Sequence, residues 1–138
     1  MDNNALIHEW FHKAEMDIAT ALFMQKYRPI PVEIICYHCQ QAGEKILKGI
    51  LAASNSEIPR THRLEIVLDL VSPFEPSLVK LTDDCFELSP YATISRYPSS
   101  IDLNEQDMGI ALNALGNIIN AIQDCGYIIQ HDELANDN

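Results

Sequence analysis

Hydrophobic residues recur along most of the chain at the three- and four-residue spacing of an amphipathic helix, and prolines or short polar clusters interrupt the pattern. No useful stretch alternates with the two-residue period of a half-buried strand. The pattern predicts helices over about residues 4–26, 31–53, 62–71, 76–88 and 103–130. We therefore expect an all-α fold, an antiparallel up-and-down bundle of about five helices.

Short polar signals mark the ends of these helices. Pro31 suits the first position of the second helix, and Thr61 is placed to cap the third. Asp102 precedes Glu105 by three residues, which is the spacing of a capping box at the start of the fifth helix. These signals predict where the segments begin.

The second predicted helix has a continuous apolar face, and its predicted core positions are Ile35, Cys39, Ala42, Ile46 and Ile50. All five glycines fall inside predicted helices, where Gly43, Gly49 and Gly116 would let neighbouring helices approach closely. A chain of 138 residues fits one domain. We predict that this domain spans residues 1–130, followed by a polar, disordered tail over 131–138.

The charge balance limits the possible functions. Nine Lys and Arg against 20 Asp and Glu give a formal net charge of −11, which repels nucleic-acid phosphates at long range and leaves room only for a local cationic patch.

The N-terminus lacks the basic start of a signal peptide, and the apolar runs are far shorter than the roughly 20 residues that cross a bilayer. We expect a cytoplasmic protein without a membrane segment and with reduced thiols.

Two spacings raise the question of a metal site. Cys36 and Cys39 have the separation of a zinc knuckle, and His8 and His12 lie about one helical turn apart. However, the cysteine pair lacks a second Cys or His doublet, and the two histidines, which stand in "HEWFH" with the H-E-x-x-H spacing of metalloproteases, are interpreted as surface residues. The sequence therefore predicts no metal and no cofactor, with the cysteines as mostly buried thiols.

A polar stripe runs beside the apolar face of the second predicted helix. His38, Gln41, Lys45 and Lys48 are three, four and three residues apart, so they share one side of the helix. Such a stripe is usually solvated surface, but in this acidic chain its lysines are rare cations that suit a phosphate-bearing ligand. The predicted ligand-binding residues are His38, Gln41, Lys45, Lys48, His62, Arg96 and Tyr97, and no catalytic residue is assigned.

Four blocks of sequence, taken together, resemble a known family. They are "WFHKAEMDIATA", "YHCQQAGEKILKGIL", "PRTHRLEIVLDL" and "YATISRYP", and the likeness extends over nearly the whole chain to about Tyr127. In their order and spacing they are similar to the small bacterial and archaeal HEPN domains. The resemblance implies a five-helix bundle that forms homodimers and binds nucleotides. It also implies a nucleotidyltransferase-type partner, often in a toxin–antitoxin pair.

Many members of that family are metal-independent ribonucleases whose site is an arginine followed at a short distance by a histidine. This chain departs from the pattern, because none of Arg28, Arg60, Arg63 and Arg96 has a histidine at the required distance. Ser99 and Arg63 also stand where the resemblance leads us to expect aspartate. The predicted function is a homodimeric nucleotide- or RNA-binding module that works with a nucleotidyltransferase-type partner. The alternatives are a divergent metal-independent ribonuclease and a ligand-free structural interaction module.

Overall fold

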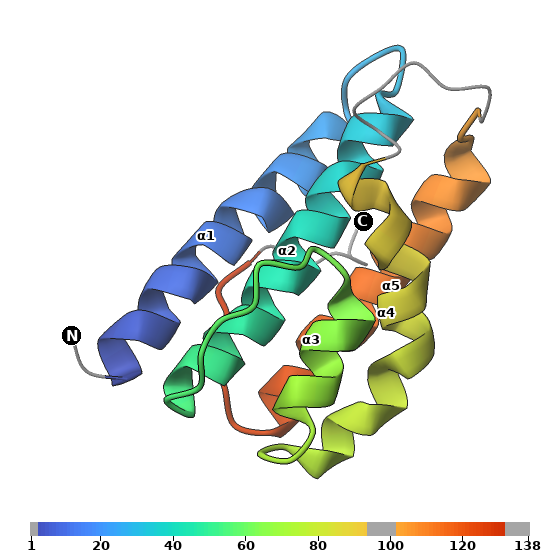
Figure 1. Cartoon of the computed structure of the whole chain (residues 1–138). Helices are drawn as coiled ribbons and strands as arrows, with labels where there is room; N and C mark the ends of the chain where they lie inside the picture. Colours follow the sequence, from blue (N-terminus) through green and yellow to red (C-terminus); the bar gives the residue numbers. More distant parts are fainter. Residues whose placement is uncertain (1–2, 94–101, 132–138) are drawn as a thin grey trace.

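The computed structural model describes residues 3–93 and 102–131, and every regular element within these ranges is helical (Figure 1). This confirms the predicted all-α fold class. The elements are α1 (Asn3–Met24), α2 (Val32–Ala53), α3 (Leu64–Val71), the 3-10 helix η1 (Pro76–Leu81), α4 (Thr82–Leu88), the 3-10 helix η2 (Ser89–Ala92) and α5 (Glu105–Asp124).

Helix α2 lies at the centre of the bundle and packs against α1, α3 and α5. The apolar face predicted for it is confirmed, since each of its five predicted core positions is at most 1% exposed. Two glycines on α2 allow close contact with its neighbours. An added Cβ would lie 2.9 Å from Trp10 Cβ at Gly49 and 2.7 Å from Leu64 Cδ2 at Gly43. The missing side chains thus let α1 and the start of α3 pack directly on α2.

Helix α5 is shorter than the sequence predicts at both ends. Its capping box is formed by Asn104 and Asp107, with side-chain to backbone distances of 2.9 Å in both directions, and not by Asp102 and Glu105. The helix ends at Asp124 because Gly126 adopts a φ of 99°, a left-handed conformation that favours glycine. The apolar residues that follow Gly126 extended the predicted helix beyond its true end.

The segments that precede α5 also differ from their predicted form. The predicted helix over residues 76–88 is a 3-10 helix, η1, followed directly by α4. Helix α3 begins at Leu64 with Arg63 in the cap position. The hydroxyl of Thr61 accepts a hydrogen bond from the N–H of Arg63, before the helix begins. The prediction of Thr61 as the cap is therefore wrong by two residues, because the chain remains extended through Arg63.

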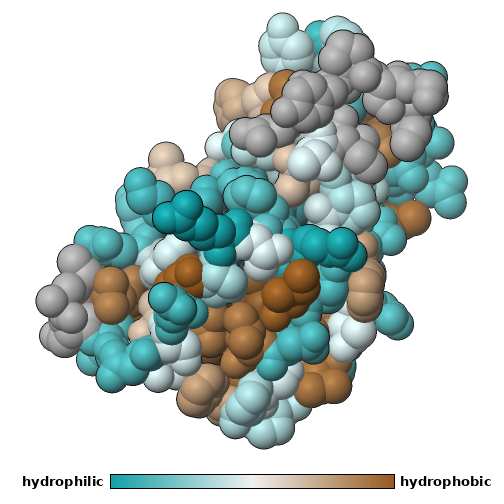
Figure 2. Space-filling model, viewed as in Figure 1, coloured by the Kyte–Doolittle hydropathy of each residue, from teal (hydrophilic) through white to brown (hydrophobic). Residues whose placement is uncertain are grey.

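The molecular surface seen in Figure 2 is mostly hydrophilic. Hydrophobic residues gather in the lower half of this view, over α3. Within the described residues, no helix combines the length and hydrophobicity that a bilayer-spanning segment needs. The predicted polar tail lies, apart from His131, outside the described part of the chain.

Candidate ligand-binding site

Asp17 on α1 joins two of the predicted site residues on α2. Its Oδ1 lies 2.8 Å from His38 Nδ1, and its Oδ2 lies 2.6 Å from Lys45 Nζ. The Asp17 side chain is nearly buried, whereas those of His38 and Lys45 are each 25% exposed. A carboxylate beside Nδ1 favours the tautomer that carries its proton there, so Nε2 of His38 is left to accept a proton or to contact a ligand.

Glu44 organises the other half of the polar stripe. It accepts hydrogen bonds from Lys48 Nζ at 2.8 Å and from Gln40 Nε2 at 3.0 Å, and its Oε1 lies 3.1 Å from His62 Nδ1. Gln41 joins this network by donating to Gln40 Oε1 at 2.7 Å. Lys48 is only 5% exposed, so its ammonium depends on the Glu44 carboxylate for charge compensation.

The polar stripe is therefore built around two carboxylates. Lys48, which we expected at the edge of a pocket, is instead buried beside Glu44. His38 and Lys45 remain partly exposed, and His62 reaches the surface with 60% of its side chain accessible. The two remaining predicted site residues, Arg96 and Tyr97, lie outside the described residues.

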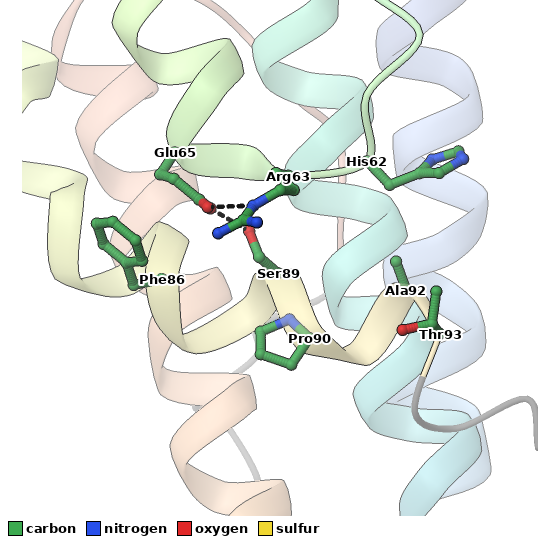
Figure 3. Close-up of a pocket in the computed structure, with 8 residues that line it drawn as sticks. All are labelled: His62, Arg63, Glu65, Phe86, Ser89, Pro90, Ala92 and Thr93. Atoms are coloured by element: carbon green, nitrogen blue, oxygen red, sulfur yellow. Dashed lines mark hydrogen bonds and ion pairs between the residues drawn. The ribbon is translucent and has the colours of Figure 1, made fainter.

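A cleft of about 460 Å³ opens where the chain enters α3, a volume within the range of ligand sites. Figure 3 shows Arg63 and Glu65 turned toward each other, with Phe86 on one side and His62 turned to the opposite side. The cleft is lined by His62, Arg63, Glu65, Phe86, Ser89, Pro90, Ala92 and Thr93. It thus combines a guanidinium group, an imidazole and an aromatic ring within one hollow.

Ser89 ties η2 to the first turn of α3 at this cleft. Its Oγ accepts a hydrogen bond from the Leu64 N–H at 2.8 Å and donates to Glu65 Oε1 at 2.6 Å. Arg63 Nε donates to Glu65 Oε2 at 2.7 Å. Within the part of the chain that the structure describes, the terminal nitrogens of Arg63 make no hydrogen bond.

The electrostatics of Glu65 keep this arrangement in place. Burial alone raises the pKa of the Glu65 carboxyl, but hydrogen bonds from Ser89, its own backbone N–H and Arg63, together with the charge of Arg63, lower the pKa below its ordinary value. Glu65 is therefore ionised at neutral pH and holds the Arg63 guanidinium in one orientation.

The family model for the HEPN domain matches residues 7–125 of the chain. The chain belongs to the HEPN domain family. No curated protein and no solved structure shows significant similarity to it. The match runs from α1 to the end of α5, so the contacts of Asp17, the contacts of Glu44 and the cleft all lie within the HEPN domain. The family is one generally related to nucleotides and RNA.

Three of the four thiols of this HEPN domain are buried. Burial raises the pKa of Cys36 and of Cys85 to about 12, and it also raises the pKa of Cys39. All three are free and buried, as predicted, whereas Cys125 is partly exposed. No group of three or more His, Cys, Asp or Glu side chains is placed to hold a metal ion in residues 3–93 and 102–131.

Several site residues of the HEPN domain were missed at the level of sequence. Glu44 stands four residues before Lys48, which is the spacing of an ion pair on a helix and could have identified it. Asp17 directly precedes the core residue Ile18, and a carboxylate so close to the core needs a partner that compensates its charge. Nothing in the local sequence pointed to Ser89, because its partners lie on another helix.

Proposed function

We propose that this HEPN domain is a cytoplasmic module that binds a nucleotide or RNA in the cleft at the start of α3. The observation that carries the proposal is that Arg63 lies in the cleft between the exposed ring of Phe86 on one side and His62 on the other. The terminal nitrogens of Arg63 suit two phosphate oxygens, and Phe86 offers a face on which a base can stack. Because the protein is strongly acidic, binding would depend on these local groups rather than on a broad positive surface.

The polar stripe supports a longer ligand than a mononucleotide. His62 lines the cleft and also contacts Glu44, so it links the cleft to α2. Beyond Glu44, the partly exposed His38 and Lys45 offer further contacts to phosphate along the same side of α2. An RNA strand that follows this path would pass from Phe86 to Lys45.

Arg63→Ala should weaken binding of adenosine monophosphate and of a short single-stranded RNA by about tenfold or more, since one charge-assisted contact is worth roughly 1.5–3 kcal/mol. Lys13→Ala removes one exposed positive charge from α1 and serves as the control, with unchanged affinity expected. Phe86→Ala should abolish the preference for the nucleotide over ribose 5-phosphate. Calorimetric titration measures the affinities, and a thermal melt checks that each variant folds. Absence of binding by the wild type would contradict the proposal and leave the ligand-free interaction module.

A divergent metal-independent ribonuclease is the second candidate, because His38 and Lys45 meet at one carboxylate. His38 Nε2 would take the proton of a ribose 2′-hydroxyl as its oxygen attacks phosphorus, and Lys45 would stabilise the negative charge on the phosphoryl oxygens. The 5′-oxygen would then leave with a proton from water. Cleavage of the same RNA in the presence of EDTA should fall by about 100-fold or more in His38→Ala. An unchanged rate in that variant would assign the cleavage to a contaminant.

The proposal includes a homodimer and a nucleotidyltransferase-type partner in a toxin–antitoxin arrangement, both of which the family resemblance implies. The outer side of α1 and the turn after it support the homodimer, because Met16, Phe23 and Tyr27 are exposed there. Acidic and basic residues are also balanced between Asn3 and Arg28, so two copies of this face would not repel each other.

A further inference from the structure

The outer face of α3 and α4 carries large hydrophobic side chains that the described residues leave uncovered. Ile66 and Leu70 lie one turn apart on α3 and are 41% and 43% exposed. Phe74 follows Leu70 by four residues, and Phe86 on α4 lies beside the first turn of α3; both are also exposed. We call these four residues the α3–α4 patch. Figure 2 shows the hydrophobic residues gathered over α3.

The surroundings of the α3–α4 patch are acidic. Residues 63–93 contain two basic residues, Lys80 and Arg63, of which Arg63 is paired with Glu65. The same range contains six acidic residues, which are Glu65, Asp69, Glu75, Asp83, Asp84 and Glu87. Asp69 directly precedes Leu70, and Asp83 lies one turn before Phe86, so exposed carboxylates border the hydrophobic side chains. A surface that is hydrophobic at its centre and negative at its rim selects a partner that is hydrophobic with a positive rim.

This charge pattern distinguishes between possible occupants. A second copy of the chain, paired by a two-fold axis through the patch, would place one acidic rim against the other. Like charges brought together at an interface cost several kcal/mol, which argues against self-association here. The balanced charges around the exposed side chains of α1 impose no such cost, so the two faces favour different partners.

We infer that the α3–α4 patch binds an amphipathic, basic helix of another protein. Ile66, Leu70 and Phe74 follow one another at intervals of four residues, and such a row suits the apolar stripe of a helix laid along α3. Lysine or arginine side chains beside that stripe would meet Asp69 and Asp83. Phe86 also lines the nucleotide cleft, but Ile66 and Leu70 do not, so substitutions at these two residues test this interaction without altering the proposed ligand site.

The test uses a synthetic helix of about 18 residues with a leucine stripe flanked by lysines, and a matched peptide in which glutamate replaces lysine. Fluorescence anisotropy should show binding of the lysine peptide to the wild type and no binding of the glutamate peptide. Leu70→Ser together with Ile66→Ser should weaken binding of the lysine peptide by about tenfold or more. Asp69→Lys should weaken it as well, and added salt should reduce the affinity.

Ile110→Ser is the matched control, because Ile110 is an exposed isoleucine on α5 with 44% of its surface accessible. Its affinity for the lysine peptide should equal that of the wild type. An equal loss in Ile110→Ser and in the patch variant would overturn the inference, since the peptide would then be binding the acidic surface without regard to the patch. Conversion of a dimer to a monomer by Leu70→Ser and Ile66→Ser, seen by sedimentation, would overturn it in favour of a second copy.

Discussion

Glu44→Gln is expected to lower the free energy of unfolding by about 3–5 kcal/mol, which is the range for removing one partner of a buried ion pair. The substitution keeps the shape of the side chain but removes the negative charge 2.8 Å from Lys48 Nζ. Both side chains are buried, at 7% and 8% exposure, so little water could replace the lost charge. The Lys48 ammonium would then remain buried without compensation. Urea denaturation followed by circular dichroism measures the loss.

Two further variants make the Glu44 result specific. Glu33→Gln removes a negative charge from an exposed position on the same helix and should change stability by less than about 1 kcal/mol. The double variant Glu44→Gln with Lys48→Met removes both charges and should recover most of the lost stability. If Glu44→Gln and Glu33→Gln had equally small effects, the buried ion pair would not contribute to the fold as we describe.

Gly49→Val should destabilise the protein by about 3 kcal/mol through overpacking between α1 and α2. An added Cβ would lie 2.9 Å from Trp10 Cβ and 3.0 Å from Phe11 Cε1. Because Trp10 Cβ is attached directly to the backbone, relief of this contact requires α1 to move away from α2. A thermal melt together with urea denaturation measures the change.

Gly109 supplies the matched position for the same substitution. It lies within α5, and no heavy atom would be within 4 Å of an added Cβ. Gly109→Val should therefore change stability by no more than about 0.5 kcal/mol, with a slight gain because glycine is a poorer helix former than valine. Equal losses at Gly49 and Gly109 would show that the cost does not arise from the close packing of α1 on α2.

The sequence by itself determined which segments are helical and which side of α2 faces the core. Residues three and four apart share a helix face whatever the remainder of the fold does, so the pattern through Cys39, Ala42 and Ile46 could be interpreted locally. Helix ends were less certain because neighbouring polar residues offer the same spacing. Asp102 with Glu105 and Asn104 with Asp107 are both three residues apart, and only the backbone geometry selects the second pair.

Only the tertiary structure decided what the polar residues do. Asp17 is separated from His38 and Lys45 by 21 and 28 positions, and Ser89 is separated from Leu64 by 25. A local period shows that His38 and Lys45 lie on one side of α2, but it carries no information about which side chain of another helix lies opposite. That choice depends on how the helices pack and on the path of the loops. Packing also buries Glu44 together with Lys48. The spacing of the polar stripe is typical of solvated surface, and only the burial of these two side chains makes them an ion pair inside the bundle.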